Sequence, residues 1–178
     1  MDQNGAAATL TWPLTLAAAT IAGSLVTACM MPFVTIAVLA AATMPRAQAL
    51  ITVVGVWMVN QLLGFGLLHL PLTGHALGWG AALGGASIAA MLVAERVIAG
   101  RRQAARVATA FGLAFVVYEL LLLAFACVAG GLDTFSPVIV GRLLANEAAW
   151  FVMLATLWLT LARALPWLRG RTPLPQLG

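Results

Sequence analysis

Hydrogen-bonding and charged side chains interrupt the apolar stretches of this sequence at three places. These side chains are Asn60 and Gln61 in one stretch, Glu119 in a second, and Arg142, Asn146 and Glu147 in a third. Such groups cost free energy where water is excluded, so they usually have a role. Counted inward from the predicted segment ends, Glu119 and Glu147 lie about 15 Å deep, Asn60 about 12 Å and Arg142 roughly 8 Å. We expect one polar layer, which would form the floor of a ligand pocket.

The same layer has a purely structural interpretation, in which Arg142 forms an internal ion pair with Glu119 or Glu147. Asn146 lies four residues after Arg142 and would share its helix face, so the guanidinium would be satisfied without a ligand. A pair of this kind ties helices together, and removing one partner costs about 3 kcal/mol or more. A second carboxyl group remains unexplained by the pair, which favours the pocket.

A second group of candidate residues lies at segment ends on one side of this layer. It contains both histidines, a cysteine and a pair of methionines: His69, His75, Cys29, Met30 and Met31. Imidazole, thiolate and thioether groups bind late first-row metals. Each residue alone is explained by packing or by anchoring at a membrane interface. Together they predict a metal or a metal-containing ligand, held by His75, His69 and Cys29.

Aromatic residues at the same segment ends add a further possibility. Trp57, Trp79 and Phe135 would stack on a planar organic ligand or form the aromatic belt of a membrane protein. We include Trp79 with the candidate ligand-binding residues.

The composition identifies the class of element that holds these residues. The chain has 178 residues, of which 63% are hydrophobic and 8% charged, and it cannot present a water-soluble surface. The net charge of +4 comes from arginines between apolar runs, as in the loops of membrane proteins, so no nucleic-acid partner is predicted. The sequence predicts an all-α integral membrane protein that is surrounded by membrane lipid.

About six helical segments are expected, because a spanning helix needs roughly 20 apolar residues. They run from about Trp12 to Ala28, Phe33 to Thr43, Ala47 to Leu68, Ala76 to Val97, Val107 to Ala129 and Val138 to Leu165. We expect one transmembrane domain over residues 12–168, with short tails at 1–11 and 169–178.

The second of these segments is shorter than the others. Pro32 and Pro45 bracket it, which limits it to roughly 18 Å. It forms either the short arm of a hairpin with the first segment, the arrangement we favour, or part of one long helix kinked at Pro32.

The arginines predict the orientation. Arg46 follows the second segment, and the other clusters follow the fourth and sixth segments, at Arg96 to Arg106 and Arg163 to Arg171. These are alternate loops, so the positive-inside rule places them and both termini in the cytoplasm. The expected location is the inner (cytoplasmic) membrane, as a multi-pass protein.

The stretch from Phe33 to Leu50 (FVTIAVLAAATMPRAQAL) resembles the second helix, the Pro-Arg turn and the start of the third helix in substrate-binding S components of energy-coupling factor (ECF) vitamin transporters. The chain length and helix count also agree. The resemblance implies a ligand pocket near the outer face. It also implies that small residues on the first helix, here Ala18, Ala22 and Gly23, dock a membrane-embedded transporter subunit that works with ATPases.

Among these proteins, the cobalamin-specific members are the most similar. In some of them a cysteine after the third helix coordinates cobalt, whereas this chain has His75 in that region and no cysteine there. The resemblance implies uptake of a small-molecule ligand, either cobalamin or a cobalt-type metal ligand.

Two other classes of function remain open. A stand-alone permease would move a metal ion or protons with Glu119 and Glu147 as titrating groups. An intramembrane enzyme would need a metal or nucleophile motif, and the sequence contains neither H-E-x-x-H nor G-x-S-x-G. The Gly-rich phosphate loop is also missing, so an ATPase partner would have to supply any energy from ATP.

Overall fold

The computed structural model describes residues 11–19, 31–99 and 103–164, and within these ranges it contains helices and no strand. Residues 11–19 are helical. The elements that follow are α2 (Phe33–Thr43), α3 (Arg46–Leu62), the π-helical turn η1 (Leu63–Leu67), α4 (Gly74–Ile98), α5 (Ala104–Ala129), the 3-10 turn η2 (Leu132–Phe135) and α6 (Pro137–Ala164). The prediction of an all-helical protein is confirmed for the described residues.

Four helices are long and apolar enough to cross a membrane. They are α3 together with η1, α4, α5 and α6, which have 22, 25, 26 and 28 residues. At 1.5 Å per residue they are about 33 to 42 Å long, which exceeds the hydrocarbon thickness of a bilayer. Their bounds agree with the last four predicted segments to within a few residues.

The second predicted segment is also a helix, and it is as short as expected. Helix α2 has 11 residues, from Phe33 to Thr43, and is about 17 Å long. The choice between a hairpin and one kinked helix depends on residues 20–30, which lie outside the described part of the chain, as do Cys29, Met30, Ala22 and Gly23.

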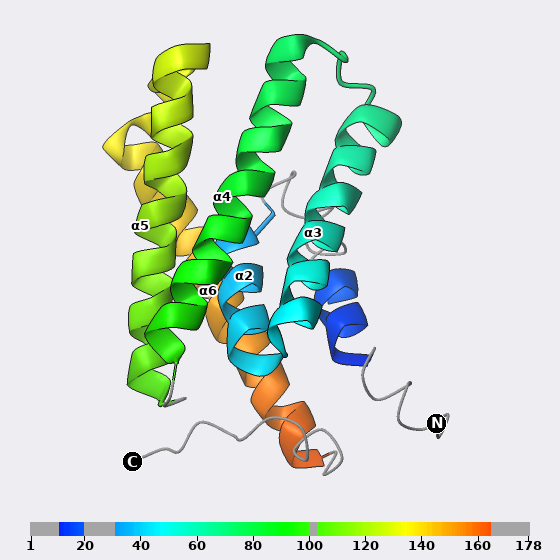
Figure 1. The fold of residues 1–178 in the computed structure, drawn as a ribbon, viewed down its shortest axis with the longest axis vertical. Coiled ribbons are helices and arrows are strands. Elements are labelled where there is room, and N and C mark those ends of the chain that lie inside the picture. Colours follow the sequence, from blue (N-terminus) through cyan, green and yellow to red (C-terminus); the bar gives the residue numbers. More distant parts are fainter. Residues whose placement is uncertain (1–10, 20–30, 100–102, 165–178) are drawn as a thin grey trace.

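Helix α2 is the centre of the bundle. It contacts α3, α4, α5 and α6, and every residue from Met31 to Ala41 is buried. A helix that is apolar on all sides is stable only when other helices surround it, because it has no polar face to present to water. Figure 1 shows α2 beside only one half of the longer helices.

Small side chains face inward on the long helices and large apolar side chains face outward. Ala90 and Ala94 on α4 and Ala110 and Ala114 on α5 are fully buried, whereas Leu120 on α5 is 57% exposed. This arrangement suits a lipid environment, in which close backbone packing holds helices together and apolar side chains face the lipid.

The contact between α3 and α4 depends on two glycines that stand four residues apart. A Cβ atom on Gly84 would lie 2.7 Å from Trp57 Cε2, and one on Gly80 would lie 2.5 Å from Gln61 Oε1. Trp57 Nε1 also donates a hydrogen bond of 2.7 Å to the Gly80 carbonyl oxygen. The glycines therefore leave the space that these two α3 side chains fill.

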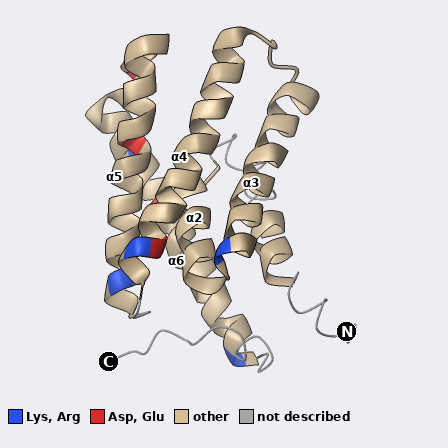
Figure 2. Cartoon of the chain, viewed as in Figure 1, with Lys and Arg blue, Asp and Glu red and all other residues tan. Residues whose placement is uncertain are grey.

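Basic residues gather at one end of the bundle (Figure 2). This is the end at which α3 and α5 begin and α4 and α6 finish. Four of the five described arginines belong to these helix ends: Arg46, Arg96, Arg106 and Arg163. We call it the basic end. The connection from α3 to α4 and the turn η2 lie at the opposite end (Figure 1).

Candidate functional site

The short helix α2 begins in the middle of the bundle, where its first main-chain N–H groups cannot reach water. Pro32 precedes it and provides no side-chain cap. The Phe33 N–H donates to the Met31 carbonyl oxygen at 3.0 Å, and the Ile36 N–H donates to the Pro32 carbonyl oxygen at 3.1 Å. The N–H groups of Val34 and Thr35 need an acceptor from elsewhere, because a helix N-terminus leaves such donors without an intrahelical partner.

Glu147 of α6 supplies that acceptor. Its Oε1 accepts from the Val34 N–H at 3.2 Å, and its Oε2 accepts from the Thr35 N–H at 2.8 Å. The Thr35 hydroxyl lies 2.6 Å from Oε2 and 2.8 Å from the main-chain oxygen of Glu147, and donates its hydrogen to one of them. Glu147 is 6% exposed. A carboxylate from one helix therefore caps another helix deep inside the protein, where the N-terminal partial charge stabilises it.

A cavity lies beyond this N-terminus, on the side toward the opposite end of the bundle. Its volume is about 290 Å³. All four long helices and the turn η2 contribute to its wall. The lining residues are Met31, Phe33, Asn60, Trp79, Leu83, Phe115, Tyr118, Glu119, Leu122, Thr134, Phe135, Ile139, Leu143, Asn146 and Glu147. Because α2 is about half as long as its neighbours, it leaves the centre of the bundle unfilled at this level.

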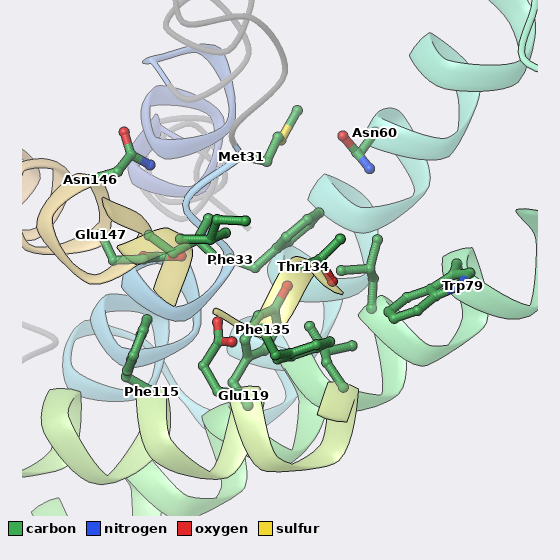
Figure 3. A pocket seen from close by; sticks show the side chains of 15 residues that line it. Met31, Phe33, Asn60, Trp79, Phe115, Glu119, Thr134, Phe135, Asn146 and Glu147 are labelled. Atoms are coloured by element: carbon green, nitrogen blue, oxygen red, sulfur yellow. The ribbon is translucent and has the colours of Figure 1, made fainter. Parts of the chain in front are cut away.

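Five of the seven predicted ligand-binding residues line the cavity: Asn60, Trp79, Glu119, Asn146 and Glu147. They come from α3, α4, α5 and α6, and Figure 3 shows them on different walls. The structure therefore brings together part of the layer predicted from helix depth, namely Asn60, Glu119, Asn146 and Glu147. The other two predicted residues, Gln61 and Arg142, do not line this cavity; Gln61 packs against Gly80 in the contact between α3 and α4.

The predicted internal ion pair of Arg142 does not form. Arg142 is exposed, and the described residues contain a single ion pair, between Arg46 Nε and Glu95 Oε2 at 3.5 Å. Glu147 takes its hydrogen-bond donors from Val34 and Thr35 instead. Glu147 needs no arginine partner, because a helix N-terminus can stabilise a buried carboxylate as an arginine would.

Four polar side chains in the cavity wall make no hydrogen bond or ion pair with the described residues: Asn60, Tyr118, Glu119 and Asn146. Tyr118 is 7% exposed, and its hydroxyl makes no hydrogen bond there. Glu119 follows it on α5 and forms neither an ion pair nor a hydrogen bond. Buried polar groups are nearly always satisfied in native proteins. Tyr118 is buried and Glu119 is half-buried, so a bound ligand would supply the partner that these two groups lack.

Aromatic residues form much of the remaining wall. Figure 3 shows Phe115 and Phe135 on either side of Glu119 and Phe33 nearby, whereas Trp79 forms the far side of the cavity. Trp79 also contacts Phe125 of α5, with ring centroids 5.1 Å apart. The sequence does not identify Phe33 and Phe115 as wall residues, because a phenylalanine in an apolar helix carries no signal that separates a cavity wall from ordinary packing. Trp57 lies against Gly84 instead.

The predicted metal ligands are not brought together in the described part of the chain. His69 and His75 are both exposed, and the described residues contain no group of three or more His, Cys, Asp or Glu side chains able to hold a metal ion. His75 lies near the cavity, because its ring is 6.5 Å from the ring of Trp79. Cys29 lies outside the described residues, and Met31 lines the cavity.

The chain matches no protein-family model, no curated protein and no solved structure. The site must therefore be interpreted from its own geometry. An apolar and aromatic cavity with a few converging polar groups, placed among helices, is the usual form of a small-molecule binding site.

Proposed function

We propose that this chain is a membrane-embedded binding protein, similar to the S components of ECF vitamin transporters, which captures a small ligand from the outer face for uptake. The observation that carries the proposal is the cavity of about 290 Å³ beyond the N-terminus of α2. A central helix of half length that leaves a polar and aromatic cavity in a bundle of longer helices is difficult to explain by packing alone, since it costs buried contacts.

The direction of capture rests on the positions of the arginines. Loops rich in arginine remain in the cytoplasm, so the basic end, with Arg46, Arg96, Arg106 and Arg163, would face inward. The cavity lies in the other half of the bundle, beneath η2 and the connection from α3 to α4. It would then open to the outside of the inner membrane.

Cobalamin is one ligand that this proposal includes. His75, His69 or Cys29 would then coordinate the cobalt, and the nearness of His75 to Trp79 in the cavity wall supports this position. Sites for drug-sized ligands have volumes of about 300 to 1,000 Å³. The cavity is at the lower limit of that range, so it would enclose only part of a corrinoid. A smaller organic ligand would fit entirely.

A partner subunit with ATPases would dock on the first helix. Residues 11–19 support this part of the proposal, because Leu14 is 62% exposed and Ala18 is also exposed. The other side of this helix is anchored, since Trp12 Nε1 donates a hydrogen bond of 2.9 Å to Thr43 Oγ1. The exposed side combines a large apolar residue with a small one, which is the surface that membrane helices use for close contact.

Two measurements test the proposal. Protein purified in mild detergent should carry a small molecule that native mass spectrometry detects and denaturation releases. Cells that express the chain should accumulate that molecule, and Glu119→Gln should reduce accumulation while leaving the thermal stability of the protein nearly unchanged.

Glu95→Gln is the matched control, because Glu95 pairs with Arg46 at the basic end and does not line the cavity. It should leave accumulation unchanged. If no small molecule copurifies and Glu119→Gln does not affect accumulation of any vitamin or metal, the proposed function is wrong. For cobalamin, a change in its visible spectrum on binding that His75→Ala abolishes would show coordination of the cobalt by imidazole.

A further inference from the structure

The ionisable side chains of the cavity wall are all acidic among the described residues. The lining residues include two carboxyl groups, Glu119 and Glu147, and no arginine, lysine or histidine. An arginine does occur on α6, at Arg142, but it is exposed and does not line the cavity. A ligand that enters therefore meets acidic groups, and no basic group among the described lining residues balances them.

The two carboxyl groups differ in what already stabilises them. Glu147 accepts hydrogen bonds from the main-chain N–H groups of Val34 and Thr35, and the partial positive charge of the α2 N-terminus lies beside it. Glu119 has no such partner among the described residues. Glu119 is half-buried, and such a carboxylate attracts a cation more strongly than an exposed one, because less water screens the interaction. Glu119 is therefore the group that lacks a counter-charge.

The rest of the wall matches an organic cation better than a metal ion. Phe33, Phe115 and Phe135 lie near Glu119, and Trp79 lines the far side of the same cavity (Figure 3). Aromatic faces attract ammonium groups. The hydroxyl of Tyr118 is buried and has no hydrogen-bond partner in the described part of the chain, and it can accept a hydrogen bond from an ammonium N–H. A metal ion such as Ca²⁺ needs six or more oxygen ligands, and the described residues provide no cluster of three metal-binding side chains.

We propose that the cavity binds an organic cation, in which a protonated amine or quaternary ammonium group contacts Glu119 and an apolar or aromatic body fills the space between the aromatic side chains. This inference rests on the proposed function and specifies the chemical class of the ligand. The volume of about 290 Å³ suits a compact molecule, at the lower limit for drug-sized ligands.

Three soluble probes with one carbon skeleton test the charge preference. Binding of 2-phenylethylamine, 2-phenylethanol and phenylacetate to the full chain in lipid nanodiscs would be measured at pH 7 by isothermal titration calorimetry. The amine should bind roughly tenfold or more tightly than the alcohol, as expected for one charge-assisted contact. Phenylacetate should bind most weakly, since its charge has the same sign as that of the wall.

Two substitutions assign the preference to one residue. Glu119→Gln keeps the side-chain shape and should lower the affinity for the amine to that for the alcohol, with the affinity for the alcohol unchanged. Glu95→Gln changes the net charge of the protein equally but lies outside the cavity, so it should keep the full preference. The ratio of amine to alcohol affinity in the unsubstituted protein needs no variant, so a folding failure of Glu119→Gln would leave the test intact.

The possible results separate this inference from the proposed function. If the alcohol or phenylacetate binds as tightly as the amine, or if Glu119→Gln keeps the preference, the organic-cation inference is wrong while the binding cavity stands. Tighter binding of Co²⁺ than of the amine, lost in Glu119→Gln, would also overturn it in favour of a metal ion. If none of the three probes binds, the inference is overturned, and absence of any copurified small molecule would then overturn the proposed function as well.

Discussion

Glu147 links two helices that are far apart in the sequence, because its carboxylate holds the N–H groups at the start of α2. Removing the carboxylate in Glu147→Ala leaves two buried donors without an acceptor. Each unsatisfied buried group costs about 1 to 3 kcal/mol, so we expect the free energy of unfolding in detergent to fall by about 3 kcal/mol. Denaturation followed by tryptophan fluorescence would measure the change.

Arg142→Ala provides the contrast. The side chain is exposed and has no ion-pair partner among the described residues, so its removal should change stability by no more than about 0.5 kcal/mol. The ion-pair interpretation of the sequence predicts the reverse, a large loss on removal of Arg142. A loss of about 3 kcal/mol for Arg142→Ala would therefore contradict the structure.

Substitution of Tyr118 should leave the stability unchanged or raise it, in contrast to the loss expected for Glu147→Ala. The Tyr118 hydroxyl is buried and has no hydrogen-bond partner among the described residues, so Tyr118→Phe removes a polar group that folding leaves unsatisfied. The melting temperature of the unliganded protein should stay the same or rise, since burial of an unpaired hydroxyl costs about 1 to 3 kcal/mol. A clear fall in the melting temperature, measured by differential scanning fluorimetry, would mean that the hydroxyl has a structural partner.

For single residues, the sequence predicts the depth of a side chain along its helix better than it predicts the residue with which that side chain forms hydrogen bonds. The depth of Glu119, Glu147 and Asn60 in their segments follows from the helical rise, and all three line the cavity. The pairing of Glu147 with Thr35 joins residues 112 apart in the sequence. No local sequence pattern predicts this pairing. Pro32 indicates that α2 begins without a side-chain cap, but it does not indicate which residue accepts the hydrogen bonds instead.

Among the elements, the contact between α3 and α4 is sensitive to one methyl group. A Cβ on Gly84 would lie 2.7 Å from the ring of Trp57, which is held in place by its hydrogen bond to the Gly80 carbonyl oxygen. Gly84→Ala should therefore cost about 1 to 3 kcal/mol of stability, the usual range for overpacking a well-filled contact. Thermal unfolding in detergent would measure it.

The neighbouring glycine is the control. A Cβ on Gly85 would meet nothing within 4 Å, and alanine is a better helix former than glycine by about 1 kcal/mol. Gly85→Ala should thus stabilise the protein slightly. Equal effects of the two substitutions would show that helix propensity, and not the contact with Trp57, determines the outcome.

The bounds of the elements were predictable where proline and glycine interrupt the apolar pattern. Pro32 and Pro45 predict the ends of α2 because proline is disfavoured inside a helix. The consequence of that short length was not predictable from α2 alone. The cavity arises because four longer helices continue past its N-terminus, and this depends on how all five pack together.

For the whole molecule, a composition of 63% hydrophobic and 8% charged residues predicts helices that can cross a membrane, and the described residues contain four helices of sufficient length and hydropathy. The proposed orientation of the helices in the membrane depends instead on a small number of arginines. Four of the five described arginines lie at one end (Figure 2), and each Lys or Arg adds roughly 1 kcal/mol of attraction to an anionic cytoplasmic surface. The proposed orientation, with the basic end in the cytoplasm, rests on their common position.

Labelling of single cysteines in intact cells tests this orientation, after replacement of Cys29 and Cys127. Asp133→Cys lies in η2 at the end nearest the cavity, so a membrane-impermeant maleimide should label it from outside. Arg106→Cys, near the start of α5, should react only after permeabilisation. The reverse pattern would place the cavity on the cytoplasmic side. Capture from outside would then be wrong, and the same acidic, aromatic cavity would receive its ligand from the cytosol.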